Sequence, residues 1–197
     1  MQPASNFSVT EQTEDNVIIA AILNGQRHAM NVLVEKHKQY ACSLALRILH
    51  DSQLAEEVAH DSFVKALQSL SGFKKEAKFT TWLYRIVVNM AISKKRKLKM
   101  HFEDIDNTSE LDLNYSEVST HLEKEDRTHY LNQALQHLNE IDSTLITLFY
   151  FEDATIEEMA AITGYDTNNT KVKLFRARKK LTVQLQKILK EETTSLI

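Results

Sequence analysis

The amino-acid sequence predicts an all-α protein in which two small helical modules are joined by a flexible acidic linker. The 197 residues include 3 glycines and 1 proline, although sheets, hairpins and tight phosphate-binding loops need many such turn residues. Hydrophobic residues make up 43% of the chain and recur mostly at the three- and four-residue spacings of buried helix faces. Between residues 100 and 122 this spacing disappears and acidic residues accumulate, so we place the linker there.

The first module is expected at residues 14–99, after a disordered tail at residues 1–13. Glycines end its first and third helices, at Gly25 and Gly72. The hydrophobic spacing predicts helices over residues 15–24, 30–48, 54–70 and 81–99. Short polar side chains can cap the third and fourth helices, and the candidates are Asp51, Ser52, Thr80 and Thr81.

The second module is expected at residues 123–190, followed by a tail at residues 191–197. Its apolar spacing predicts two helices, at residues 130–138 and 145–151. Two further helices, joined by a short turn that contains Gly164, complete this module.

A helix-turn-helix is predicted from these last two helices. Thr155 and Glu158 have the spacing of a capping box, which starts the first, short helix. Gly164 follows where a tight turn between two helices needs a positive φ angle. Asp166 or Thr167 can cap the second helix, which is polar and basic. This order is typical of a motif that places its second helix in the major groove of DNA.

Charged residues are segregated along the chain, although the formal net charge is only −3. Residues 72–100 carry nine Lys and Arg against one acidic residue, and residues 166–190 carry eight against one. Residues 101–127, between them, carry nine acidic residues against two basic ones. Two basic blocks separated by an acidic spacer indicate two polyanion-binding surfaces, or alternatively two solvated helix faces.

The second helix of the helix-turn-helix carries the first set of candidate DNA-binding residues. Polar side chains at its start can reach base edges, and they are Asp166, Thr167, Asn168 and Asn169. Basic side chains further along can contact phosphates, and they are Lys171, Lys173, Arg176, Arg178 and Lys179. The pattern also fits a plain helical hairpin with a basic exposed face.

The last helix of the first module and the connector before it carry the second set. Basic residues lie in the connector and at the end of the helix, and they are Lys74, Lys78, Lys94, Lys95 and Arg96. One face of the helix also carries an aromatic and polar stripe, made of Trp82, Arg85, Asn89 and Arg96. Trp82 fits the hydrophobic core equally well.

The composition argues against several other classes of protein. Cys42 is the only cysteine, so neither an internal disulfide nor a paired-cysteine metal site can form. No stretch approaches the ~20 apolar residues of a membrane span, and residues 1–16 do not have the pattern of a signal peptide. We therefore expect a cytoplasmic protein without membrane insertion.

No constellation of residues predicts an enzyme or a cofactor. The sequence contains no phosphate-binding loop, nucleophile elbow or Cys/His pair. His121, Glu125 and His129 recur at four-residue spacing and could bind a metal, but a surface helix rich in ions explains them more simply. We expect no metal site here.

Three segments resemble the extracytoplasmic-function (ECF) sigma factors of bacterial RNA polymerase. Residues 55–67 (AEEVAHDSFVKAL) are similar to the family's polymerase-docking helix in region two. Residues 79–97 (FTTWLYRIVVNMAISKKRK) are similar to its promoter-melting helix, and residues 145–181 resemble its region four. The chain departs from the residues usual in the family at Asn139, Tyr165 and Thr170.

This resemblance implies a sigma factor that binds core polymerase, recognises promoter DNA and helps to melt it. Acidic residues of region two are expected to contact the clamp helices of the polymerase β′ subunit, and they are Glu56, Glu57 and Asp61. Glu56 and Glu57 also suit the positive N-terminal end of a helix dipole. An anti-sigma factor is implied as a further partner.

The two DNA surfaces receive different promoter elements under this resemblance. The surface from Lys74 to Arg96 meets the displaced strand of the minus-ten element, and the helix-turn-helix reads the duplex minus-thirty-five element. The acidic linker either runs through the polymerase channel as a mimic of nucleic acid or is a solvated tether.

A stand-alone helix-turn-helix regulator is the main alternative. Such a protein also carries a segment like residues 155–180, but it normally dimerises and binds symmetric duplex sites without polymerase. Residues 29–99 distinguish the two, because a repressor needs no second basic and aromatic surface. Co-purification with core polymerase subunits separates the alternatives.

Overall fold

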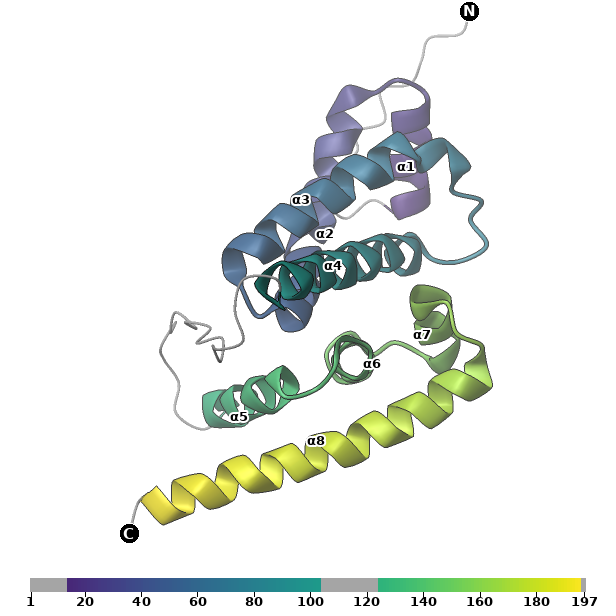
Figure 1. Ribbon diagram of the computed structural model, residues 1–197. Helices are drawn as coiled ribbons and strands as arrows, with labels where there is room; N and C mark the ends of the chain where they lie inside the picture. Colours follow the sequence, from purple (N-terminus) through teal and green to yellow (C-terminus); the bar gives the residue numbers. More distant parts are fainter. Residues whose placement is uncertain (1–13, 104–123, 196–197) are drawn as a thin grey trace, which may run out of the picture.

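The computed structural model describes residues 14–103 and 124–195, and within these residues it consists of helices and turns (Figure 1). The predicted all-α fold class is confirmed. The expected tail at residues 1–13 and most of the expected linker lie outside the described residues. Residues 100–103, which we assigned to the linker, instead continue the last helix of the first module.

Four α-helices and one short 3-10 helix make up the first module. They are α1 (Asp15–Leu23), α2 (Arg27–Leu49), α3 (Ser52–Gln68), η1 (Leu70–Gly72) and α4 (Phe79–Glu103). The α2, α3 and α4 helices pack against one another, and α1 packs on α2. Fully buried side chains from these helices form the core, among them Ile18, Leu33, Leu44, Ile48 and Leu83.

Two helix starts in this module follow from different causes. Asp51 caps α3 as predicted, because its carboxylate accepts a hydrogen bond from the Leu54 backbone N at 2.8 Å. The α4 helix begins at Phe79, so Thr80 and Thr81 lie inside it and do not cap it, contrary to the prediction. Phe79 is buried, and packing of its ring in the core extends the helix to this residue.

The end of α3 also differs from the prediction. The helix ends at Gln68, before Gly72, and a 3-10 turn follows. Ser69 Oγ donates a hydrogen bond to the Lys65 carbonyl at 2.7 Å, which competes with continuation of the helical ladder.

In residues 124–195, the second module contains three helices packed on a long C-terminal one. They are α5 (Lys124–Gln136), α6 (Glu140–Tyr150), α7 (Ile156–Thr163) and α8 (Thr167–Ser195). The other three all pack on α8. Residues 191–195, which we assigned to a tail, continue α8, and residues 196–197 lie outside the described part of the chain.

The predicted helix-turn-helix is formed by α7 and α8. Thr155 Oγ1 accepts a hydrogen bond from Glu158 N at 3.2 Å, and Glu158 Oε2 accepts one from Thr155 N at 3.0 Å, so the capping box is confirmed. Gly164 has a φ of 78° in the turn, as predicted. Asp166 Oδ1 accepts from Asn169 N at 2.8 Å and thereby caps α8.

The α6 helix starts at Glu140, earlier than predicted. Asn139 caps it by accepting a hydrogen bond from Asp142 N at 2.9 Å. Its first turns carry polar residues that are nevertheless buried, including Asp142, Ser143 and Thr144. These polar residues at core positions hide the apolar spacing on which the prediction depended.

The two modules pack against each other. Figure 1 shows α7 beside α4, and α6 contacts α2. At the second contact, Ser143 Oγ donates to the Arg47 carbonyl at 3.2 Å, and the Arg47 guanidinium lies 3.9 Å from the Phe151 ring centroid. Because the modules pack together, the two predicted DNA surfaces belong to one packed body.

Candidate nucleic-acid interfaces

The first turn of α8 presents polar side chains to solvent. Thr167, Asn168 and Asn169 are all exposed. Asp166 is exposed too, but its carboxylate is engaged in capping through Asn169 N, which gives it a local structural role. Hydroxyl and amide groups in this turn are of the kind that pair with base edges in the major groove.

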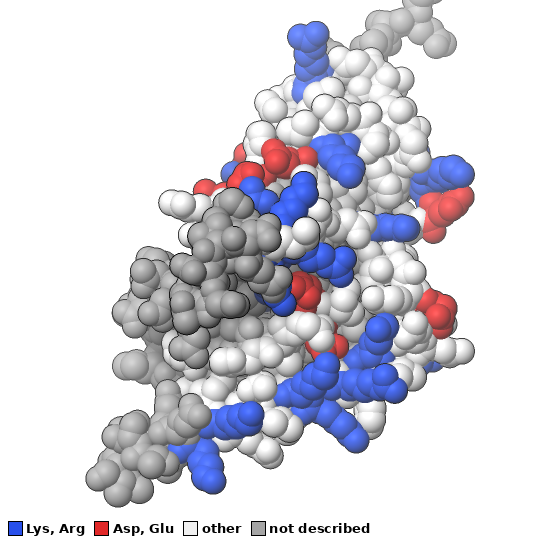
Figure 2. Space-filling view, viewed as in Figure 1, with Lys and Arg blue, Asp and Glu red and all other residues white. Residues whose placement is uncertain are grey.

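Basic side chains follow along the exposed face of α8. The exposed ones among the predicted contacts are Lys171, Arg176 and Lys179. Figure 2 shows Lys and Arg side chains gathered along the lower edge of the view, where Figure 1 places α8. This surface carries the charge that phosphate contacts require.

Two other predicted contacts on α8 are engaged within the module. Lys173 is half-buried, with its Nζ 4.7 Å from the Tyr165 ring centroid. Arg178 lies over aromatic rings of α6, with its guanidinium carbon 4.1 Å from the Phe149 centroid and 5.5 Å from the Tyr150 centroid. The position of Arg178 favours a packing role over the predicted contact with DNA.

The stripe on α4 is largely open to solvent. Its exposed members are Arg85, Asn89 and Arg96. Trp82 is half-buried, and its ring centroid lies 5.3 Å from that of Phe73 and 5.8 Å from that of Phe79. Trp82 therefore combines the two predicted environments, since it packs on an aromatic cluster while part of it reaches the surface.

Two lysines near the end of α4 have partners within the first module. Lys94 Nζ lies 2.6 Å from Glu57 Oε1 on α3. Lys95 Nζ donates to the Ile48 carbonyl at 2.8 Å, near the end of α2, and burial lowers the pKa of Lys95 although nearby Glu140 raises it. Lys95 thus ties two helices together, which favours a structural role over the predicted contact with DNA.

The connector before α4 contributes Lys74 and Lys78, which are both exposed. Lys78 Nζ lies 2.9 Å from Glu158 Oε1 and so joins the connector to the capping box of the other module. The hydrogen bond from Lys78, followed by the backbone hydrogen bond at Thr155, lowers the pKa of Glu158.

A partly buried hydrogen bond also joins the modules. The Tyr84 hydroxyl, on a side chain that is 8% exposed, donates to Glu152 Oε2 at 3.0 Å. Burial raises the pKa of Tyr84, and burial also raises the pKa of Glu152 although Tyr84 and Arg47 lower it. Tyr84 lies on another face of α4 than Arg85, so the modules pack together and leave the stripe exposed.

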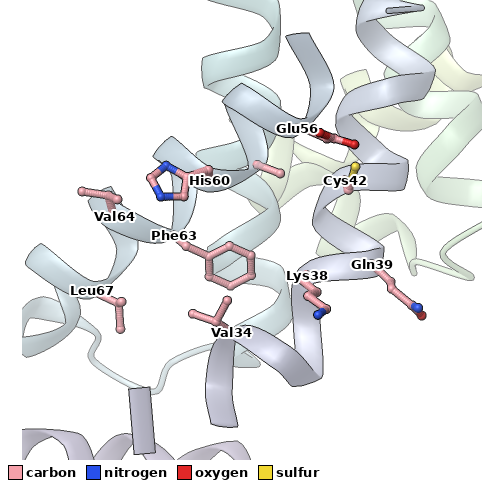
Figure 3. Close-up of a pocket in the computed structure, with 10 residues that line it drawn as sticks. Val34, Lys38, Gln39, Cys42, Glu56, His60, Phe63, Val64 and Leu67 are labelled. Atoms are coloured by element: carbon pink, nitrogen blue, oxygen red, sulfur yellow. The ribbon is translucent and has the colours of Figure 1, made fainter. Parts of the chain in front are cut away.

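The acidic residues predicted to contact polymerase are exposed on α3, and they are Glu56, Glu57 and Asp61. Glu56 borders a groove between α2 and α3 (Figure 3). Sequence analysis missed this groove, because it is formed only when two helices come together. Its other lining side chains include Val34, Lys38, Gln39, Cys42, His60, Phe63, Val64 and Leu67.

Among the side chains that the structure describes, those of residues 14–100 and 129–190, no group of three His, Cys, Asp or Glu is arranged to hold a metal ion. Of the residues considered for a metal site, the side chains of His121 and Glu125 lie outside these ranges, and His129 is hydrogen-bonded to Gln133 at 2.9 Å. Within the same ranges, no helix is long and apolar enough to cross a membrane.

Comparison with known families matches both modules. The sigma-70 region 2 model matches residues 33–100, and the sigma-70 region 4 model matches residues 128–181. The chain belongs to the sigma-70 family of RNA polymerase sigma factors. The predicted resemblance to ECF sigma factors is confirmed, and with it the expectation of a transcription initiation factor.

Relatives of this sigma factor match most of its length. The RNA polymerase sigma-H factor of Pseudomonas aeruginosa is 29% identical over 190 residues, which are 91% of this chain and 98% of the relative. The sigma factor SigV of Bacillus subtilis is 34% identical over 78% of this chain and 89% of its own length. The ECF sigma-E factor of Haemophilus influenzae is 28% identical over 92% and 100%.

Solved structures share the fold of this sigma factor. CnrH, in complex with the cytosolic domain of CnrY, gives a TM-score of 0.64 at 20% identity and covers 87% of this chain and 97% of its own. The sigma factor RpoE of Bartonella quintana, with the anti-sigma factor NepR, gives 0.63 at 21% identity, with 78% and 94% covered.

Several apolar residues of α8 are exposed although the sequence did not predict it, and two of them lie among the basic side chains. Val172 is 48% exposed and Phe175 is 58% exposed. The buried side of the helix is formed by residues such as Leu174 and Leu181. Apolar residues that fall outside this buried stripe were the signal in the sequence that could have revealed them.

Proposed function

We propose that this sigma factor holds promoter DNA on two separate surfaces. The α8 helix binds the duplex minus-thirty-five element, and α4 with its connector binds the displaced strand of the minus-ten element. The observation that carries the proposal is that each module exposes its own row of basic and polar side chains. We assign region two to the module that begins at residue 14 and ends with α4, and region four to the module formed by α5 to α8, with a linker between them.

The α8 surface suits duplex DNA. Asn168 and Asn169 lie in its first turn, where the helix of a helix-turn-helix enters the major groove, and amides pair with base edges there. Lys171, Arg176 and Lys179 add exposed charge along the same helix for phosphates on either side of the groove. The proposal gives Arg178 no part in this contact, because it packs on aromatic rings of α6.

The α4 surface suits a single strand. Single strands are held by aromatic side chains on which bases stack and by cations that follow the backbone. The exposed part of Trp82 supplies such an aromatic surface, and Arg85 and Arg96 supply the cations. Asn89, between them on the same stripe, is placed to read the edge of an unstacked base.

The groove on α2 and α3 suits a helical partner with basic residues. Its apolar lining can receive apolar side chains of a helix. The exposed carboxylates of Glu56, Glu57 and Asp61 lie on α3, the helix that forms one side of the groove. We assign this face to the clamp helices of the polymerase β′ subunit.

The remaining expectations follow from the same proposal. The chain acts by binding and not as an enzyme, and it works in the cytoplasm, where RNA polymerase acts. An anti-sigma factor is a further proposed partner, as the family resemblance implies. The acidic linker connects the two DNA-bound modules along the polymerase.

Run-off transcription with purified core polymerase on a library of genomic promoters tests this function. We expect transcripts only when the chain is added, and co-elution of the chain with core subunits. A stand-alone regulator would instead bind duplex DNA as a dimer and leave core polymerase inactive on these templates, which would overturn the proposal.

The docking face is tested by charge reversal. Replacement of Glu57 and Asp61 by Lys should lower the affinity for core polymerase about tenfold at low salt and less at high salt. The reason is that charges at the rim of an interface mainly change the association rate, and salt screens this effect. Glu14→Lys, at an exposed acid before α1, is the control and should bind normally. Equal affinity of the double variant and the control at both salt concentrations would remove this face from the interface.

A further inference from the structure

A cavity lies where the two modules meet. Its volume is about 430 Å³, and small-molecule sites in proteins measure about 300–1,000 Å³. From the first module, α4 lines it with Thr80, Thr81 and Tyr84. From the second module, the loop between α6 and α7 lines it with Glu152 and Asp153. A molecule bound in this cavity therefore contacts both modules.

One wall of the cavity is the amino end of α4. Trp82 N donates a hydrogen bond to the Lys78 carbonyl at 3.2 Å, so the N–H groups of the residues between them have no carbonyl partner within the helix. Such a helix end carries partial positive charge and attracts carboxylates. The Lys78 side chain lines the same wall. This wall is suited to a carboxylate.

The Thr81 hydroxyl adds a hydrogen-bond donor to this wall. Thr81 is 5% exposed and lines the cavity, yet its side chain forms no hydrogen bond with the part of the chain that the structure describes. A threonine inside a helix often donates to the carbonyl one turn earlier, as Thr144 does to the Glu140 carbonyl at 2.6 Å. Because a buried hydroxyl without an acceptor is unfavourable, a ligand carboxylate beside Thr81 would stabilise this arrangement.

The wall formed by the second module is acidic, with the carboxylates of Glu152, Asp153 and Glu158. Glu158 pairs with Lys78 at 2.9 Å, and Glu152 accepts from the Tyr84 hydroxyl at 3.0 Å. Asp153 is exposed and forms no ion pair with the described residues. Burial raises the pKa of Glu152, and the charge of Asp153 raises it further. An ammonium group between these two carboxylates would stabilise both charges.

Apolar side chains complete the lining, and they are Phe151, Ala154 and Ile162. They can pack against an aliphatic group of a ligand. Metal binding is not favoured, because no group of three His, Cys, Asp or Glu among the described side chains is arranged for it. The lining thus matches a molecule that carries a carboxylate, an ammonium and an aliphatic group.

We propose that the cavity between the modules binds a free aliphatic amino acid. Its carboxylate lies at the start of α4 beside Thr81, and its ammonium lies at Glu152 and Asp153. This site goes beyond the proposed function, because its ligand is neither DNA nor polymerase. Since the ligand contacts both modules, its binding stabilises their packing against each other.

Equilibrium dialysis of the full chain against L-leucine and two analogues tests the site. Isopentylamine lacks the carboxylate of leucine, and 4-methylpentanoate lacks the ammonium. We expect saturable leucine binding and about tenfold weaker binding of each analogue, because each loses its contacts with one charged wall. Absence of leucine binding up to millimolar concentrations, or equal affinity for leucine and either analogue, would overturn the proposal.

Two variants test the two walls separately. Thr81→Val keeps the shape of the side chain but removes the hydroxyl, so it should weaken leucine and 4-methylpentanoate about tenfold and leave isopentylamine unchanged. Asp153→Asn removes a charge at a residue with a φ of 47°, a conformation that asparagine tolerates. This variant should weaken leucine and isopentylamine about tenfold and should not weaken 4-methylpentanoate.

Matched controls lie outside the cavity. The Thr182 hydroxyl donates to the Arg178 carbonyl on α8, and Glu157 is an exposed acid on α7. Thr182→Val and Glu157→Gln should bind leucine like the wild type, and thermal unfolding without ligand checks that every variant is folded. Wild-type affinity for leucine in both Thr81→Val and Asp153→Asn, or the same loss in the controls, would overturn the proposal. These measurements use neither polymerase nor DNA, so their outcome is independent of the proposed function.

Discussion

At the scale of single residues, His50 shows how burial sets the chemistry of a side chain. It is 9% exposed and follows α2 with a φ of 59°, and its Nε2 has no hydrogen-bond partner in the described part of the chain. Burial, followed by the charge of Lys95, lowers the pKa of His50 from 6.5 to about 4. Native His50 is therefore neutral at pH 7.

This pKa predicts acid sensitivity. The pKa of His50 is lower in the folded chain than in the unfolded one, so between pH 6.5 and about 4 the unfolded chain binds a proton that the folded chain does not. The free energy of unfolding is therefore unaffected by His50 above pH 6.5 and decreases as the pH falls towards 4. The free energy of unfolding should fall by ~3 kcal/mol from this source between pH 7 and pH 4. His50→Asn, which tolerates the left-handed conformation, should show a flatter profile in urea titrations. Parallel profiles for the two proteins would contradict the assignment.

Residue identity alone did not separate surface cations from internal ones. Lys95 and Arg178 belong to basic clusters in the sequence, yet they contact the Ile48 carbonyl and the Phe149 ring. These partners lie many residues away along the chain, so local pattern does not reveal them. Arg85 and Arg176, which are exposed in the structure, matched the expectation of solvent-facing cations.

At the scale of elements, α8 combines a structural face and a binding face. Replacement of exposed Lys171 or Arg176 by Ala should reduce the slope of log affinity against log salt by about 1 each, because each variant loses one phosphate contact. Arg178→Ala should leave the slope unchanged and instead lower stability by about 1 kcal/mol through lost packing. Salt titrations of promoter binding measure the first effect, and urea titrations measure the second. Equal salt slopes for all variants would exclude the proposed division of α8 into a DNA-binding face and a structural face.

The capping box gives a second prediction at this scale. Thr155→Ala removes the acceptor for Glu158 N and should destabilise the protein by about 1 kcal/mol. Thr182→Ala is the matched control, because the Thr182 hydroxyl bonds only to the carbonyl one turn earlier, at Arg178, and does not cap a helix. The measurement is urea unfolding of both variants. Equal stability of the two would show that the box contributes little here.

Helices with regular apolar spacing and clear caps were predictable, and α6 was less so. The spacing of α2 and the Thr155 box are local properties that the sequence displays directly. The start of α6 depends on buried polar residues whose partners come from elsewhere, as when Ser143 donates to the Arg47 carbonyl and Lys180 pairs with Asp142. Such positions read as solvent-exposed in a sequence, because only the tertiary contacts make their burial favourable.

At the scale of the whole molecule, the contact between the modules was beyond local prediction. It depends on pairs far apart in the chain, namely the Tyr84 hydroxyl on Glu152 and the Lys78 ammonium on Glu158. The second pair involves an exposed lysine and contributes little, whereas the first has a buried tyrosine and is more costly to break.

Tyr84→Phe should therefore loosen the module contact. The variant leaves the half-buried Glu152 carboxylate without its donor, which costs about 1 kcal/mol and favours separation of the modules. We expect a larger radius of gyration in small-angle scattering of the free protein. Tyr150→Phe, at a 51% exposed tyrosine of α6, should match the wild type. An unchanged radius for Tyr84→Phe would show that other contacts hold the modules together.

The central claim is that α8 holds duplex DNA while α4 holds the opened strand. Holoenzymes with Asn89→Ala and Arg176→Ala can be compared on a duplex promoter and on the same promoter unpaired across the minus-ten element. Both changes are at exposed positions, so folding should be preserved.

Two readouts together test this claim most directly. Permanganate reactivity of unpaired thymines on the duplex promoter measures opening, and affinity for the upstream element is measured in parallel. We predict that Asn89→Ala binds the upstream element normally but opens the duplex poorly, since the cost of unstacking is no longer offset by contacts to the opened strand. Arg176→Ala should bind the upstream element weakly on both templates, because its duplex site is the same in each. Normal opening by Asn89→Ala, or identical defects of both variants on both templates, would contradict the account.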